Sequence, residues 1–165
     1  MRKQLVGRLF ELSQGFYVKH FKQKKEPWGL TKAALLTYPE GTLGNGIGLF
    51  LQANGFEVID KVERHDAYHV LLGFNTRAQD EIALQYVCLG NGKRSKYLFG
   101  VILLGSFILP EYANYYYRCF KLGRQLNCFY SFDYKLLLDQ SLDDLRATIC
   151  TPQQQLLIHQ FSYRY

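Results

Sequence analysis

Two histidines and two acidic residues lie close together in the middle of the chain. The pattern is His65-Asp66-x-x-His69, with Glu81 twelve residues after His69. Imidazole and carboxylate groups are ligands that zinc and other divalent metals accept. On an α-helix His65 and His69 lie one above the other, and Asp66 lies about 100° around the helix axis from His65. The sequence therefore indicates a candidate divalent-metal site made of these four residues.

A helical hairpin would bring Glu81 to the histidines. Gly73 is a typical residue to end the first helix, and Thr76 is a typical residue to cap the second. A second helix that starts after Thr76 and runs back antiparallel would carry Glu81 to the height of His69. We therefore expect the metal site on a helical hairpin, with three ligands on the first helix and one on the second.

The two histidines also fit ordinary helix packing. Val62, His65, His69 and Leu72 form one stripe of a helix, so the imidazoles could be half-buried side chains bonded to neighbours. Two carboxylates buried beside them without a cation would be costly, which favours a metal. The pattern is not the HExxH motif of metalloproteases, since no glutamate lies between the histidines. The spacing alone leaves both interpretations open.

The length and composition of the chain indicate one globular domain over residues 1–165. Of the 165 residues 48% are hydrophobic, which is enough for a core of its own but short for two domains. No secretory signal is expected, because the N-terminus lacks an uninterrupted apolar run. The four cysteines show no metal-binding spacing, so we expect free thiols in an intracellular, reducing compartment; they are Cys88, Cys119, Cys128 and Cys150.

Apolar residues recur at helical spacing along most of the chain, and no stretch shows the alternation of a strand with hairpin turns. This predicts an all-α fold, a single-domain helical bundle. The last residues, 151–165, fit either a docked helix or a loose tail. Helices are expected over Arg2–Lys24, Leu43–Asn54, Tyr112–Asn127 and Leu136–Ile149.

An almost uninterrupted apolar stretch runs from Tyr97 to Leu109 and ends at Pro110. A helix that crosses a bilayer needs about 20 such residues, so this stretch is too short. It fits a buried core helix, and it equally fits a lipid-binding wall or a face that dips into a membrane. In the last case Lys93 to Lys96 would contact lipid headgroups.

The formal net charge of +6 does not indicate a nucleic-acid-binding protein. The basic residues concentrate in 19–25, 93–96 and 118–124, without a zinc knuckle, a helix-turn-helix or an RNP aromatic pattern. The glycines from Gly44 to Gly48 lack the GxGxxG spacing of a dinucleotide loop, since Leu49 stands at the third position. We expect these glycines to allow close helix packing.

Several motifs in one order resemble the coenzyme Q biosynthesis protein 4 family. That family carries HDxxH followed by eleven residues and a glutamate, which His65-Asp66-x-x-His69 and Glu81 match, and Leu71-Leu72-Gly73 also matches its continuation. Upstream, 39–44 reads PEGTLG, a signature of the family; downstream, Gly123-Arg124 and Leu145-Arg146 resemble its GR and LR pairs. The similarity covers about residues 30–150, which leaves 151–165 as a segment outside the family-like core.

The resemblance implies a function as well as a fold. It implies that the protein is an all-helical homodimer that binds a divalent metal, with zinc as the first expectation. The implied ligands are His65, Asp66, His69 and Glu81. It implies action on a polyprenylated aromatic lipid, either by removal of the ring carboxyl group with hydroxylation at that carbon, or as a non-catalytic scaffold with a structural metal. Other enzymes of quinone biosynthesis are further expected partners. The implied location is peripheral, on the cytoplasmic face of a bacterial membrane or the matrix face of the inner mitochondrial membrane.

Overall fold

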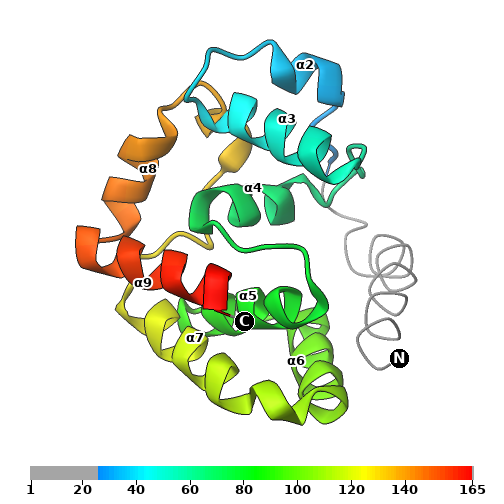
Figure 1. Ribbon diagram of the computed structural model, residues 1–165. Coiled ribbons are helices and arrows are strands. Elements are labelled where there is room, and N and C mark those ends of the chain that lie inside the picture. Colours follow the sequence, from blue (N-terminus) through cyan, green and yellow to red (C-terminus); the bar gives the residue numbers. More distant parts are fainter. Residues whose placement is uncertain (1–25, 165) are drawn as a thin grey trace.

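The computed structural model describes residues 26–164, and all regular elements in this range are helices (Figure 1). The predicted all-α, single-domain bundle is therefore confirmed. Short 3-10 turns occupy Pro110–Tyr112 and Tyr134–Leu137. The α-helices are α2 (Lys32–Leu36), α3 (Leu43–Asn54), α4 (Glu63–Leu72), α5 (Ala78–Gly90), α6 (Lys96–Ile108), α7 (Ala113–Gln125), α8 (Leu142–Ile149) and α9 (Pro152–Arg164).

The helices form two groups, with α4 and α5 facing each other where the groups meet. Helix α3 packs against α2 and α4, whereas α5 packs against α6 and α7 (Figure 1). Helix α8 returns to α4, and α9 follows it. Helix α9 is docked on the bundle. Ile158 is buried, and the ring of Phe161 contacts that of Tyr115 on α7 edge-on, with centroids 6.1 Å apart. Residues 151–164 are thus a docked helix and not a loose tail.

The predicted helix over Leu136–Ile149 is wrong in its first half. The chain makes the 3-10 turn, continues as a turn and a bend over 138–140, and α8 begins only at Leu142, capped by the Ser141 side chain. The carbonyls of this non-helical segment bond to α3: the N–H groups of Leu43 and Gly44 donate to the carbonyls of Gln140 and Leu138, at 2.9 and 2.8 Å. These carbonyls satisfy the free N–H groups at the start of α3, which a continuous helix would leave without partners.

Glycine permits close packing, as expected, at Gly44 and Gly48 of α3. A tighter crossing joins α5 to α7. A Cβ atom on Gly90 would lie 2.2 Å from the carbonyl oxygen of Phe120, and one on Gly123 would lie 2.1 Å from that of Val87. Because both obstacles are backbone atoms, no side chain fits at either position. The two helices therefore touch backbone to backbone near their C-terminal ends.

The apolar stretch 97–109 forms α6, and α6 is a surface helix and not a buried core helix. Only Leu98 and Gly105 of this helix are buried, whereas Leu103 is 79% and Phe107 is 85% exposed. Within residues 26–164 no single helix is long and apolar enough to cross a membrane. Helix α6 and the helical segment Pro110–Gln125, which meet at a bend of 104°, are together long and apolar enough to do so by length and composition.

Of the remaining predicted helices, two are confirmed and one lies outside the residues that the structure describes. Leu43–Asn54 is a helix with those bounds, ended by Gly55 at φ +67°, and Tyr112–Asn127 corresponds to α7. All four cysteines are free thiols, as expected. The predicted helix over Arg2–Lys24 lies outside the described residues.

Candidate metal centre

The hairpin that carries the candidate ligands is α4 and α5. Helix α4 ends at Gly73, whose φ of +68° is a left-handed conformation that glycine adopts at little cost. Helix α5 begins one residue later than predicted, at Ala78, without a side-chain cap. Thr76 does not cap it; its hydroxyl donates to the Oδ1 atom of Asn54 at 3.2 Å. The helical hairpin is therefore as predicted, but the first turn of α5 is held by a contact other than the predicted Thr76 cap.

That contact is a buried polar cluster around Asp80. Arg77 Nε donates to Asp80 Oδ2 at 2.7 Å, and the hydroxyl of Tyr115 on α7 donates to Oδ1 at 2.9 Å. Burial raises the pKa of Asp80, and the bonds from Tyr115 and Arg77 oppose that rise. The cluster ties the first turn of α5 to α7, and it fixes the backbone next to Glu81.

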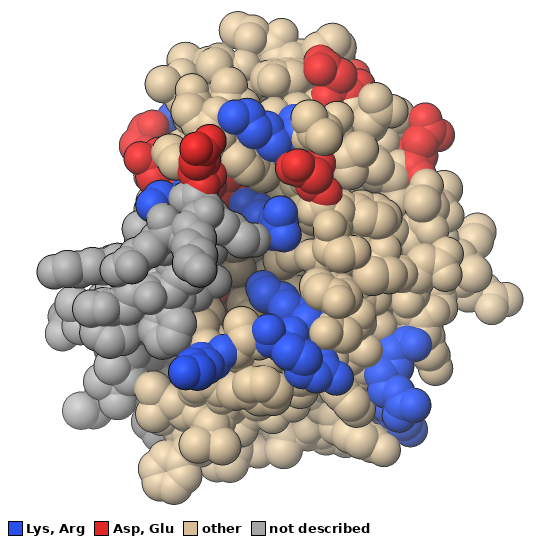
Figure 2. Space-filling view, turned by 180° about the vertical axis from the view of Figure 1, so that it is seen from behind, with Lys and Arg blue, Asp and Glu red and all other residues tan. Residues whose placement is uncertain are grey.

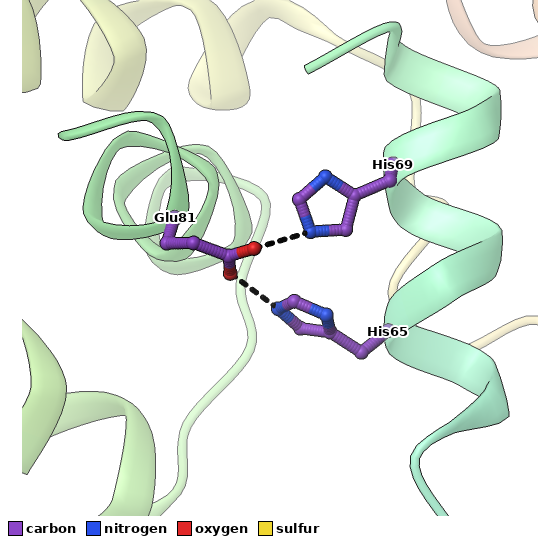
Figure 3. A group of neighbouring side chains, drawn as sticks. All are labelled: His65, His69 and Glu81. Atoms are coloured by element: carbon purple, nitrogen blue, oxygen red, sulfur yellow. Dashed lines mark ion pairs between the residues drawn. The ribbon is translucent and has the colours of Figure 1, made fainter. Parts of the chain in front are cut away.

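The Glu81 carboxylate lies between the two histidines (Figure 3). Its Oε1 atom is 3.1 Å from His69 Nε2, and its Oε2 atom is 3.3 Å from His65 Nε2. The side chain of His69 is 2% exposed, and those of Glu81 and His65 are 14% and 18% exposed. One ligand atom from each residue lies within 4.8 Å of the others, so the three can hold one metal ion. Sequence reasoning had placed these residues together correctly.

The hydrogen bond of His69 on its far side determines which nitrogen faces Glu81. His69 Nδ1 lies 3.0 Å from the carbonyl oxygen of Phe74, and since a carbonyl only accepts, Nδ1 carries a proton. Nε2 of a neutral His69 would then present its lone pair to a carboxylate oxygen at 3.1 Å. That contact is repulsive unless a proton or a metal ion lies between the two atoms. A backbone carbonyl bonded to the far nitrogen is also the usual support of a metal-ligating histidine.

The charges around the cluster agree with this description. Burial disfavours the imidazolium of His69, but the Glu81 carboxylate outweighs burial and the pKa of His69 is raised. For His65 burial prevails over Glu81 and the pKa is lowered. Burial raises the pKa of Glu81, but the two imidazoles lower it more, to well below its usual range. These directions favour an anionic Glu81 and a neutral His65, as a metal site requires, whereas His69 would have to release the proton on Nε2 when a metal binds.

One atom of the cluster lacks an adequate protein partner. Glu81 Oε2 is buried and makes no hydrogen bond of good geometry among the described residues, although His65 Nε2 is 3.3 Å away. A buried carboxylate oxygen without a hydrogen bond is costly. A divalent ion bonded to both His65 and Glu81 would remove that cost, so the residues present fit a metal.

Asp66, the fourth predicted ligand, is not part of the three-residue cluster. It lies on α4 next to His65, and its charge contributes to the raised pKa of His69. Its role as a ligand stays a prediction. Helix α3 adds a further neighbour, because the ring of Phe50 stacks on that of His69, with centroids 5.3 Å apart and planes at 16°.

Sequence reasoning missed two polar residues of this region. Gln85 lies one turn after Glu81 on α5, is 1% exposed, and neither atom of its amide has a hydrogen-bond partner in the part that the structure describes. Lys93, which was expected only as a headgroup contact, has its Nζ atom 5.0 Å from the centroid of the Tyr68 ring on α4. A glutamine at helical spacing from a candidate ligand was the one signal for Gln85; Lys93 gave none.

The all-helical fold of this chain has a counterpart among solved structures. The structure is similar to the crystal structure of a Nostoc punctiforme protein described as a candidate ubiquinone biosynthesis protein, with a TM-score of 0.60. The two chains are 22% identical, over 89% of this chain and 80% of the other. No protein-family profile matches the chain, and no curated protein matches it. The likeness shows that the two proteins share a fold.

Proposed function

We propose that the protein is a metal-dependent enzyme of ubiquinone biosynthesis that removes the ring carboxyl group of a polyprenylated benzoate. The observation that carries this proposal is the cluster of His65, His69 and Glu81, whose ligand atoms converge and are of the types that a divalent metal accepts. Three protein ligands leave room for a substrate group, whereas structural zinc sites have four. The fold shared with the Nostoc protein supports the pathway.

The residues of the site have separate tasks. His65, His69 and Glu81 would hold the metal, and zinc fits the two nitrogens and one oxygen well. When bound, the ion supplies a positive charge that can hold an aryl carboxylate or another oxygen-bearing group. Phe50 stacks on the ring of His69, the carbonyl of Phe74 accepts a hydrogen bond from its Nδ1 atom, and these contacts orient a histidine that is almost fully buried. Asp66 is proposed as a proton carrier in the enzyme; as a fourth ligand it would instead complete a structural site.

The proposed reaction breaks the bond between the ring carbon and the carboxyl carbon, and carbon dioxide leaves. In the simple form the ring carbon keeps the electron pair and takes up a proton. In the hydroxylating form dioxygen gives one oxygen atom to that carbon and the other to water, while a donor supplies two electrons and two protons. The test is mass spectrometry of zinc-loaded and metal-free protein with a short-chain prenylated 3,4-dihydroxybenzoate, under air with an added two-electron donor such as NADH and under nitrogen. No loss of the carboxyl group with any added divalent metal would refute the proposal.

A non-catalytic scaffold is the second candidate, and the location of the cluster favours it. The three residues join the α2–α4 group to the α5–α7 group, so a metal there would tie the two groups together. A structural metal predicts a large fall in melting temperature on chelation and no turnover. A catalytic metal predicts turnover that chelation abolishes with a small change in stability. Chelator titration followed by both readouts separates the candidates.

We also infer a peripheral position on a membrane, with α6 as the contact. Phe99, Leu103 and Phe107 follow one another at four-residue intervals on α6 and are 48%, 79% and 85% exposed. Arg94 and Lys96, both exposed, lie at the start of this helix. Figure 2 shows that lysine and arginine side chains gather over the middle and lower part of one face, with acidic ones above them. An apolar stripe beside cations suits a surface of anionic lipid.

Vesicle sedimentation tests the contact. Phe107→Glu should abolish binding to vesicles that contain phosphatidylglycerol, whereas Leu136→Glu, at a residue that is 76% exposed outside α6, should leave binding unchanged. Binding should weaken as salt is added. If Phe107→Glu binds vesicles as the wild type does but changes the molecular mass in solution, the stripe is instead an interface between two copies.

A further inference from the structure

A lysine from the loop after α5 lies beside the candidate metal centre. The Nζ atom of Lys93 is 5.0 Å from the centroid of the Tyr68 ring, and Tyr68 directly precedes His69 on α4. The side chain is half-buried. Tyr68 lies three residues after His65 on α4, and residues three apart are neighbours on a helix surface, so the ring under Lys93 adjoins His65 as well as His69. Lys93 is therefore a cation at the edge of a site that itself would hold a dication.

The loop that carries Lys93 is held firmly. Gly92, at φ +107°, turns the chain, and the N–H of Lys93 donates to the carbonyl of Cys88 at 3.0 Å. The amide of Asn91 makes five contacts of hydrogen-bond length to one distant segment. Its Nδ2 atom donates to the carbonyls of Gly123, Leu126 and Asn127, and its Oδ1 atom accepts from the N–H groups of Phe129 and Tyr130. The backbone of Lys93 is therefore held in one position.

The aromatic ring below the ammonium group is also fixed. The hydroxyl of Tyr68 donates to the carbonyl of Tyr130 at 3.2 Å. The rings of Phe129 and Tyr134 pack edge-on against that of Tyr68, with centroids 5.6 and 5.5 Å away. A cation over such a ring face gains attraction without losing its ability to donate hydrogen bonds. Lys93 thus remains available to an anion.

No acidic side chain of residues 26–164 forms an ion pair with Lys93. A lysine close to a metal-loaded cluster is repelled by it, and an anion that bridges the two would turn that repulsion into attraction. We propose that Lys93 binds the carboxylate of the aromatic acid that occupies the metal site. The identity of the anion rests on the proposed function; the presence of an anion-binding lysine rests on the geometry alone.

Titration calorimetry with 4-hydroxybenzoate, a water-soluble probe of the head group, tests the assignment on the zinc-loaded full chain. Lys93→Met should weaken binding by about tenfold or more, the usual loss when a charged hydrogen bond disappears. Lys93→Arg should retain most of the affinity. The matched control is Lys121→Met, because Lys121 Nζ also lies 5.0 Å from a tyrosine ring centroid, that of Tyr117 on α7. This control should bind as the wild type does.

Zinc affinity is the second measurement and shows whether Lys93→Met is folded. It should be equal to or higher than that of the wild type, because a positive charge has been removed near the metal. Equal affinity of Lys93→Met and wild type for 4-hydroxybenzoate would overturn the proposal, as would no binding of this probe to the wild type. If only phenyl phosphate binds, and does so through Lys93, the carboxylate assignment is overturned. Lys93-dependent binding without turnover of a prenylated acid would support the proposal and refute the enzymatic function.

Discussion

Replacement of Glu81 by glutamine gives the sharpest test of the metal centre. The amide has nearly the shape of the carboxylate, so it can still contact the nitrogens that lie 3.1 and 3.3 Å from the two oxygens. It removes the negative charge of the three-residue cluster. Loss of one unit charge at metal-ligand distance costs more than about 3 kcal/mol even at an effective dielectric constant of 20. The dissociation constant for zinc should therefore rise by more than about a hundredfold.

Melting curves with and without zinc show this loss of zinc affinity as a smaller rise in melting temperature. Free zinc at about one hundred times the wild-type dissociation constant stabilises the folded state by about 2.7 kcal/mol. In a chain of this size that raises the melting temperature by roughly 5–11 °C. At the same zinc concentration Glu81→Gln should gain about 0.4 kcal/mol, or roughly 1 °C. Each variant is compared with its own metal-free form, so changes in intrinsic stability cancel.

Two further substitutions complete this experiment. Asp143→Asn removes a carboxylate that is 92% exposed and far along the chain, and it should leave the zinc-dependent rise intact. Asp66→Asn should reduce the rise if Asp66 is the fourth ligand, and should preserve it if the three-residue cluster is complete. A rise in Glu81→Gln equal to that of the wild type would refute the metal centre.

Three other predictions follow from the packing and the charges. Gly123→Ala should lower the free energy of unfolding by about 2–3 kcal/mol in urea denaturation, because its Cβ would lie 2.1 Å from a backbone oxygen, whereas Gly100→Ala, with open space around it, should raise it by up to about 1 kcal/mol. Gln85→Met should stabilise the ligand-free protein by about 1–2 kcal/mol, since it removes a buried amide without a described partner, and a destabilised variant would show that the amide has one. Zinc affinity should fall as the pH drops through the raised pKa of His69, beginning above 6.5, because a proton on Nε2 competes with the metal. A zinc affinity that does not change between about pH 8 and pH 6 would contradict this prediction.

The proximity of three of the four candidate ligands was predictable from the sequence because their geometry is mostly local. His65 and His69 meet by helical spacing, and Gly73 marks the turn that returns Glu81 to them. Lys93 was not predictable, since its position depends on the bonds of Asn91 to a segment more than 30 residues away.

Two errors in the helices have the same origin in distant contacts. The carbonyls of Leu138 and Gln140 serve the start of α3, which no local pattern reveals, so a continuous helix was expected there. Apolar composition predicted α6 but not its exposure, because burial depends on which neighbours are present. Periodicity indicates which side of a helix is apolar and not what covers it.

The two attachments of α5 determine which part of the site can move. At one end Asp80 is bonded to Tyr115, and at the other the backbones of α5 and α7 touch at Gly90 and Gly123. Helix α5 should therefore travel with α7, and any widening of the space between the histidines and Glu81 must displace α4. The single tryptophan of the chain is well placed to report such a step, because the backbone N–H of Trp28 donates to Glu63 Oε1 at the start of α4, at 2.9 Å. Its fluorescence offers a native, label-free signal for the opening and closing of the histidine helix.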